Sequence, residues 1–281
     1  MTRHQRQIRR AQLLRIFAQG MLFLTLLMLS GIVIFILASG LPHINMQLLF
    51  GDYGKYPSIK PALLGTLSLT LLALVIAAPI GIGTALFLTE YTRTRSHLIR
   101  AIRIASETLS GIPSIVYGIF GYLVFAVALG FKYSLLGGGI TLAIMILPLV
   151  VRSTEESLLA VPQSLREASL ALGASKVRMI FTIVLPCAMS GILTSLILAA
   201  GRVISESAVL ILTIGMVVNK MPESLMSPGT SLALDVYYFG SNGYPEQAAA
   251  TGVVLLIVMI GINLLAVFLG KVFGKGELMH G

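Results

Sequence analysis

The chain has 281 residues, of which 56% are hydrophobic and only 11% are charged, whereas soluble domains are typically about 25% charged. This composition excludes a disordered chain, a collagen-like chain and a disulfide scaffold, argues against a soluble enzyme and favours a membrane protein. The net charge of +9 would indicate a nucleic-acid partner on a soluble protein, but in a membrane protein it can equally reflect cationic cytoplasmic loops.

Six stretches free of charge are long enough to span a membrane, since a transmembrane helix needs roughly 20 apolar residues. The predicted helices cover residues 17–39, 63–89, 108–130, 135–151, 180–201 and 248–270. The first follows an arginine-rich start, but its apolar core is longer than the roughly 7–15 residues of a signal peptide, so we expect a retained anchor. The sequence therefore predicts an all-α polytopic membrane protein with six transmembrane helices.

The basic residues indicate how these helices are oriented in the lipid bilayer. With the N-terminus inside, the segments 1–16, 90–107, 152–179 and 271–281 are cytoplasmic and hold 15 of the 20 basic residues, while the opposite loops hold four. This asymmetry follows the positive-inside rule, so both termini are expected in the cytoplasm. The basic pI is therefore explained by topology, and no nucleic-acid partner is expected.

Glu107 and the sequence SGIPSIVYGIFG, which starts at Ser110, form a first candidate substrate site. Gly111 and Pro113 are predicted to interrupt or kink a helix start and to free backbone N–H groups near Ser110 and Ser114. Such helix starts favour anions, and broken spans are associated with substrate sites. A helix that begins with proline and simply enters the membrane explains the same residues.

The longest polar cytoplasmic stretch, residues 152–178, is predicted to contain a short helix that follows Pro162 and ends near Gly173. Leu165 and Leu172 lie on its short apolar face. Such a helix between two spans suits the docking of a partner protein. The alternative is an amphipathic helix that lies on the bilayer surface.

Arg202 and Glu206 stand four residues apart in an otherwise apolar region, and on a helix they would share one face. A charge at mid-bilayer costs roughly 2.5–3.5 kcal/mol, so such residues usually face a bundle interior or a water-filled pathway. There Arg202 would attract an anion through a guanidinium fork that suits phosphate oxygens, and Glu206 would limit how tightly the anion is held. A structural ion pair, or an arginine that reaches the outer headgroups, is the alternative.

The cytoplasmic loop resembles the EAA loop of ABC importer permeases. Glu167-Ala168-Ser169, three residues, Gly173, nine residues and then I-x-L-P ending at Pro186 reproduce the spacing of that motif, with Ser169 in place of its second alanine. The resemblance implies that the loop forms a coupling helix held in a cleft of an ATP-binding subunit. It also implies that Glu167 and Gly173 link the nucleotide state to the membrane helices.

Four further motifs narrow this resemblance to phosphate ABC-transporter permeases, and within them to the PstA-type subunit. They are PAxxGTxxxT at 61–70, PxGIGTALFLTEY at 79–91, GIPSIVYG at 111–118 and GRxxxExA at 201–208. The resemblance implies an importer of inorganic phosphate whose translocation path includes the last two segments. The substrate-pathway candidates are therefore Arg202, Glu206, Glu107, Ser110, Pro113 and Ser114.

The resemblance also implies partners and a location. The partners are a homologous PstC-like permease, ATP-binding subunits and an extracytoplasmic phosphate-binding protein, and the location is the cytoplasmic membrane of a bacterium. The expected division is an N-terminal part (1–61), a transmembrane domain with the EAA loop at 160–186 (62–270) and a cytoplasmic tail (271–281).

No cofactor is expected on this chain. The sequence contains no G-x-x-x-x-G-K-[ST] motif, so ATP and Mg²⁺ are expected on the ATPase subunits. Cys187 is the single cysteine and the four histidines are scattered, so no metal site is predicted.

Three alternative functions remain open from the residues. The first is a permease for a related oxyanion such as molybdate, sulfate or phosphonate. The second is an ATP-independent channel or secondary carrier, in which Glu107 and Glu206 would be the coupling carboxylates. The third is a membrane-embedded enzyme, which should show a paired His/Asp or Ser/Lys set within the spans; the sequence has no such pair.

Overall fold

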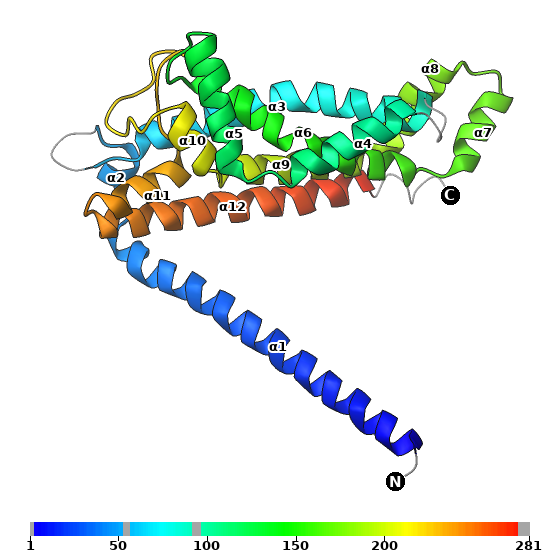
Figure 1. The fold of residues 1–281 in the computed structure, drawn as a ribbon, viewed down its shortest axis with the longest axis horizontal. Helices are drawn as coiled ribbons and strands as arrows, with labels where there is room; N and C mark the ends of the chain where they lie inside the picture. The colour runs from blue at the N-terminus through cyan, green and yellow to red at the C-terminus, as the bar shows by residue number, and fades with distance from the viewer. Residues whose placement is uncertain (1–2, 53–56, 92–96, 275–281) are drawn as a thin grey trace.

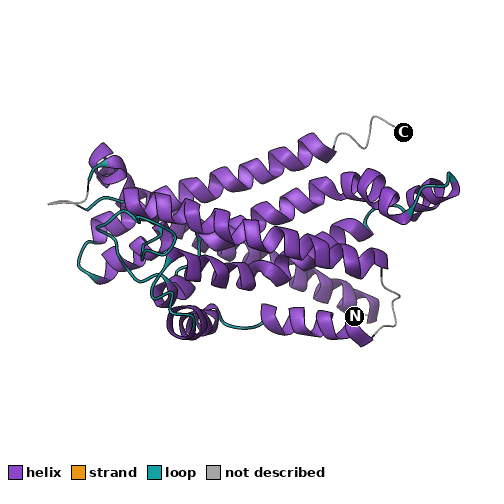
Figure 2. Cartoon of the chain, turned by 90° about the horizontal axis from the view of Figure 1, so that it is seen from above, coloured by secondary structure: helices purple, strands orange, loops and turns teal. Residues whose placement is uncertain are grey.

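The long apolar stretches form helices because a helix satisfies its own backbone hydrogen bonds where no water is available. The computed structural model describes residues 3–52, 57–91 and 97–274, and within them the regular structure is helical. Figure 2 shows the long helices other than α1 (Arg3–Gly40) running along one another, with most of the loops gathered at one end. The long helices are α1 (Arg3–Gly40), α3 (Lys60–Leu86), α6 (Leu135–Leu159), α9 (Leu185–Ile204) and α12 (Pro245–Gly274).

Shorter helices connect and extend the long ones. At the end of the bundle where α3 and α6 begin lie η1 (Leu41–His43), α2 (Met46–Phe50), α10 (Ala208–Thr213) and α11 (Leu232–Ser241). The opposite end carries α7 (Gln163–Ala171) and α8 (Lys176–Met179) (Figure 1). The remaining helices are α4 (His97–Ser110) and α5 (Ser114–Gly121), together with the π-helical segments η2 (Phe87–Tyr91), η3 (Tyr122–Ala128) and η4 (Ile180–Val184).

Five segments of the described chain are long and apolar enough to cross a membrane, and they confirm five of the predicted spans. They are Leu14–His43, Lys60–Tyr91, Leu135–Leu159, Lys176–Ile204 and Pro245–Gly270. The predicted helix over 108–130 is interrupted near its start, as expected from Gly111 and Pro113, because Ile99–Ser110 and Ser114–Ala128 are two helices bent by 101°. The count reaches six only when this bent pair is taken as one span.

The bend follows from the residues between α4 and α5. A residue before proline avoids the helical conformation, so the helix cannot continue through Ile112; α4 ends at Ser110, and Pro113 adopts φ −58° and ψ 139°. The last carbonyls of α4 are satisfied locally, since the Tyr117 hydroxyl donates to the Leu109 oxygen at 2.7 Å and the Gly111 amide donates to Thr108. The corner is therefore held by hydrogen bonds from both sides.

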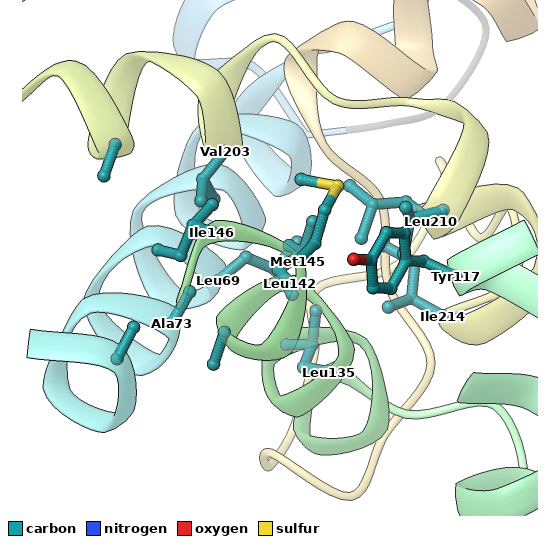
Figure 3. Packing of buried hydrophobic residues seen from close by; sticks show 14 of the residues in the cluster. Leu69, Ala73, Tyr117, Leu135, Leu142, Met145, Ile146, Val203, Leu210 and Ile214 are labelled. Carbon is teal, nitrogen blue, oxygen red and sulfur yellow. The ribbon is translucent and has the colours of Figure 1, made fainter. Parts of the chain in front are cut away.

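The main core joins α3, α6, α9 and α10 (Figure 3). Leu69 of α3, Ile146 of α6 and Val203 of α9 are buried within it. Helices in lipid associate through close packing, which small residues permit. Gly139 of α6 is one such residue, because a Cβ there would overlap the side chain of Leu72 on α3.

Helix α1 leaves this bundle and projects away from it (Figure 1). Its contact with the bundle lies near its C-terminal end, where Gly40 packs so closely on Ala249 and Val253 of α12 that a Cβ would overlap them. The most apolar window of its span is 0% buried. The side chains of this apolar window are therefore exposed at the outside of the bundle.

A buried polar cluster fixes the chain before α11. The Thr230 hydroxyl donates to the Asp235 carboxylate, and the Leu232 amide donates to the Thr66 hydroxyl of α3 at 2.9 Å. A Cβ at Gly65 would overlap the Thr230 carbonyl, so only glycine allows this close approach. The cluster ties the segment that follows α10 to the start of α3.

Candidate functional site

A cavity of about 500 Å³ lies between α4, α6 and α9 and is lined by charged side chains from all three helices. Its polar lining comprises Arg103, Ser106, Glu107 and Ser110 of α4, Arg152, Glu155 and Glu156 of α6, and Arg202 of α9. The α6 lining runs from Met145 to Leu159, which corresponds to roughly 20 Å at 1.5 Å per residue. The cavity therefore extends from the corner between α4 and α5 to the end of α6.

The polar face of α4 has a regular origin. Arg103, Ser106, Glu107 and Ser110 are spaced by three and four residues, so they lie on one side of a helix. The buried Ile99 lies one turn before Arg103 and packs with Leu88 and Val151. The apolar positions thus hold α4 against η2 and α6 while its polar side chains line the cavity.

The charges in the cavity are of two kinds. Arg103 of α4 pairs with Glu155 of α6, and Arg152 donates from Nε to Glu156 Oε1 at 3.2 Å. Arg202 and Glu107 belong to no ion pair within the described residues. Arg202 is also exposed, so its guanidinium is open to an exchangeable anion with two or three oxygens.

The four-residue spacing predicts that Glu206 lies beside Arg202 on one helix face, but in the structure it does not. The two residues do not share a helix face, because α9 ends at Ile204 and the Ser205 hydroxyl donates to the Arg202 carbonyl at 3.1 Å. Glu206 instead accepts from the Val209 amide at 3.4 Å, at the start of α10. An ion pair between Arg202 and Glu206 is absent from this structure, and Glu206 does not line the cavity.

The predicted site residues between α4 and α5 also lie partly inside and partly outside the cavity lining. Ser110 is the last residue of α4 and donates from Oγ to the Glu107 carbonyl at 2.8 Å, so the helix start expected near Ser110 lies at Ser114 instead, where no side chain caps α5. Pro113 caps α5 and Ser114 begins it. Of these residues only Ser110 lines the cavity, together with Glu107.

Several cavity residues are not among those that the sequence singles out. Arg103 and Arg152 count there only as cytoplasmic charges that set orientation, and Glu155 and Glu156 have no assigned role. The helical spacing of Arg103, Ser106, Glu107 and Ser110 is the signal that would have found the α4 face, once α4 was known to be a helix.

The predicted short helix after Pro162 is confirmed as α7, and residues 163–173 are called the α7 segment below. Gly173 has φ +81°, its amide donates to the Leu170 carbonyl, and the Ala174 amide donates to the Ser169 carbonyl. This is the Schellman arrangement, which places glycine at the left-handed position. The glycine of the EAA pattern is thus explained by the end of the helix.

The exposed surface of the α7 segment is partly apolar. Leu165 is 42% exposed and Leu172 is 90% exposed, and Glu167 and Ala168 are exposed between them. Ser169 is the buried residue of α7, at 6% exposure, which requires a small side chain there. Leucines this exposed, beside a Glu167 carboxylate that has no ion pair among the described residues, suit contact with a partner protein or with the bilayer surface.

Pro186, the last residue of the same pattern, lies apart from α7. It follows the π-helical segment η4 and stands in the first turn of α9, within the span Lys176–Ile204. A wide π turn accommodates the missing N–H of a proline inside a continuous helix. Pro186 is therefore part of a helix long enough to cross the membrane and not of the exposed surface of the α7 segment.

Residues 77–277 match the family described as "Binding-protein-dependent transport system inner membrane component". The probable ABC transporter permease protein YqgI of Bacillus subtilis is 32% identical over 266 residues, which cover 88% of this chain and 90% of that protein. The phosphate transport system permease protein PstA 1 of Mycobacterium tuberculosis is 37% identical over 210 residues, which cover 73% of this chain and 68% of that protein. PstA of Yersinia pestis is 36% identical over 76% of this chain and 72% of its own length.

Solved structures share the fold. A bacterial alginate ABC transporter in complex with a periplasmic protein matches with a TM-score of 0.69 at 17% identity, over 94% of this chain and 96% of that one. The MetNI methionine ABC transporter in an inward-facing conformation matches with a TM-score of 0.64 at 20% identity, over 76% and 95% respectively. These likenesses concern the arrangement of helices.

Proposed function

Because the chain belongs to the family of binding-protein-dependent transport system inner membrane components, we propose that it is the PstA-like permease subunit of an ATP-driven importer of inorganic phosphate. As a permease of an ABC importer it works with ATPase subunits and a substrate-binding protein. We further propose that its substrate is inorganic phosphate and that a PstC-like permease forms the second half of the pathway. The chain would lie in the bacterial cytoplasmic membrane with both termini in the cytoplasm. ATP and Mg²⁺ belong on the ATPase subunits.

One observation carries the substrate assignment: Arg202 is exposed in the cavity and has no carboxylate partner among the described residues. Its fork of N–H donors matches the oxygens of phosphate. Glu107 lines the same cavity, and a carboxylate near the anion weakens its binding, which favours release. The relatives named phosphate permeases support phosphate over other oxyanions.

The exposed side of the α7 segment suits the ATPase subunits. Leu165, Ala168 and Leu172 would be covered by that subunit, and Glu167 would pair with a cation on it. ATP-driven movement of the ATPase subunits would then reach the membrane helices through the α7 segment, and the pathway would alternate between its two openings.

Transport in reconstituted vesicles tests this proposal. The complete importer, with its ATPase and second permease, is placed in liposomes that contain ATP, and labelled phosphate uptake is measured with sulfate and molybdate as competitors. We expect phosphate to be preferred and Arg202→Ala to lower uptake about 100-fold, which corresponds to roughly 2.7 kcal/mol. Arg100→Gln is the matched control, since Arg100 is an exposed arginine of α4 outside the cavity lining.

Two results would overturn the assignment. Uptake of sulfate or molybdate in preference to phosphate would replace the substrate. Unchanged uptake in Arg202→Ala, at a normal amount of assembled complex, would remove Arg202 from the path. A third variant, Glu167→Lys, is expected to abolish association with the ATPase while the chain still inserts into the membrane.

A further inference from the structure

We propose that Arg166 is the positioning residue that transmits movement of the α7 segment to α3 and α6. This inference rests on the proposed function, since it assumes that an ATPase moves the α7 segment. It assigns a role to a side chain that faces away from the expected ATPase surface. The carboxylate it contacts is Glu90, at the end of α3.

The guanidinium of Arg166 contacts two membrane helices at once. Nε donates to Glu90 Oε1 at 3.1 Å, and Glu90 belongs to η2, the continuation of α3. Nη2 donates to the Leu158 carbonyl at 2.7 Å and Nη1 donates to the Val161 carbonyl at 2.5 Å, both at the end of α6. One side chain of α7 thus joins the ends of α3 and α6.

Burial makes these contacts stronger than surface contacts. The side chains of Arg166 and Glu90 are 11% and 7% exposed, so water competes little for either charge. Both partners also suit their positions. A carboxylate at the C-terminal end of a helix is unfavourable next to the helix dipole, and the cation offsets it; the carbonyls at the end of α6 in turn favour a cation.

Apolar packing cannot replace this link. Ser169 is the buried residue of α7, and a cavity of about 530 Å³ lies between the α7 segment and the helices beneath it. Thr89, Glu90, Gln163 and Arg166 are among the residues that line this cavity. A displacement of α7 would therefore reach α3 mainly through the contacts of Arg166, and it would reach α6 both through these contacts and through the short connection at residues 160–162.

A second contact supports the same route. Lys176 follows the α7 segment closely in the chain, and its ammonium lies 5.0 Å from the centre of the Tyr91 ring. Tyr91 is the last residue of η2. An exposed cation–π contact is weak, so it guides the segment rather than fixing it. Both contacts are made to neighbouring residues of η2, Glu90 and Tyr91. Movement of the α7 segment would therefore be passed to the C-terminal end of α3.

The experiment compares coupling in the assembled importer in liposomes. Three quantities are measured for each variant: the amount of ATPase retained by the complex, the rate of ATP hydrolysis with and without phosphate-loaded binding protein, and the phosphate moved per ATP. For Arg166→Gln we expect retained ATPase and a hydrolysis rate without binding protein that stays within about twofold of that of the unmodified importer. We expect stimulation by the binding protein to be lost and phosphate per ATP to fall at least tenfold.

Two further variants and a control separate transmission from folding. Arg166→Lys keeps the charge but cannot reach three acceptors, so we expect an intermediate loss. Glu90→Gln leaves the contacts to α6 in place and is expected to lower phosphate per ATP by about threefold. Arg100→Gln, on the exposed surface of α4, is expected to change none of the three quantities.

The outcomes are distinguishable from those for the proposed function. If Arg166→Gln reduces the amount of complex, the comparison rests on Arg166→Lys and Glu90→Gln. Normal stimulation and normal phosphate per ATP in those variants would overturn the inference. If the unmodified importer hydrolyses ATP but moves no phosphate, the proposed substrate is wrong, and the transmission is then tested with binding protein loaded with the oxyanion that the importer does take up.

Discussion

The cavity and the contact between the α7 segment and η2 both contain arginines and glutamates. The two regions differ in whether the arginine is buried and paired. At the contact with η2, Arg166 is buried, paired with Glu90 and bonded to two carbonyls. In the cavity, Arg202 is exposed and belongs to no ion pair within the described residues. A buried arginine with its donors satisfied holds helices in one arrangement, whereas an exposed and unpaired one can exchange ligands.

The largest expected effect concerns the buried pair. Glu90→Ala leaves the Arg166 charge buried without its carboxylate, which typically costs 3–5 kcal/mol, so we expect a clearly lower thermal midpoint of unfolding in detergent. The control is Glu155→Ala at the cavity, where Arg103 is 53% exposed and water replaces the lost partner. We expect that variant to cost less than about 1 kcal/mol. Equal losses in the two variants would mean that burial does not distinguish the two regions.

A comparably large effect is expected at the other end of the bundle, and it depends on pH. Burial raises the pKa of Asp235 to about 8 from its ordinary value of 3.8, and Oδ2 of this carboxylate has no hydrogen-bond partner in the described structure. The folded state therefore binds more protons than the unfolded state between about pH 4 and pH 8. Stability should fall as the pH rises through this range and level off above it.

Asp235→Asn tests this expectation, because an amide keeps the acceptor for Thr230 and carries no charge. We expect the thermal midpoint of this variant to be nearly independent of pH and to exceed that of the unmodified chain at pH 7, by up to about 4 kcal/mol in stability. Parallel pH profiles for the two chains would show that Asp235 does not carry the dependence. Unlike Arg166, this buried acid is satisfied by holding a proton, not by pairing with an opposite charge.

The sequence predicts the helices of the bundle well because uninterrupted apolar stretches have one stable form in lipid. It also predicts α7 and its end at Gly173, since the glycine takes a left-handed conformation. The break between α4 and α5 is likewise expected from Gly111 and Pro113, although hydropathy alone gives one apolar segment over 108–130. The predicted shared helix face of Arg202 and Glu206 is wrong because α9 ends at Ile204, two residues before Glu206.

The candidate site was predicted only in part, for a related reason. Glu107, Ser110 and Arg202 are brought together, but they come from α4 and α9, and no local pattern links those helices. Arg166 and Glu90 are 76 residues apart in the chain, so their contact depends entirely on how α3 meets the α7 segment. Residues from different helices that form one site can be predicted from the sequence only when each has an unusual local pattern of its own.

A smaller effect is expected when the charge of Arg202 is kept but its shape is changed. Arg202→Lys retains a cation in the cavity and loses the planar fork, which is worth about one bidentate contact. We expect phosphate uptake to fall about tenfold, or roughly 1.4 kcal/mol, against the larger loss in Arg202→Ala. Uptake in the lysine variant equal to that of the unmodified importer would show that charge alone suffices. The measurement is the initial rate of labelled phosphate uptake at equal amounts of complex.

The smallest effect is expected for Arg152, which lines the same cavity as Arg202. Its side chain and that of Glu156 are 76% and 67% exposed, and the arginine precedes the glutamate, the less favourable order on a helix. We expect Arg152→Gln to change stability by less than about 0.5 kcal/mol and uptake by less than about twofold. A loss of uptake as large as that of Arg202→Ala would mean that the cavity acts through its summed positive potential. In that case the unpaired state of Arg202 would lose its significance, and with it the distinction between the two regions.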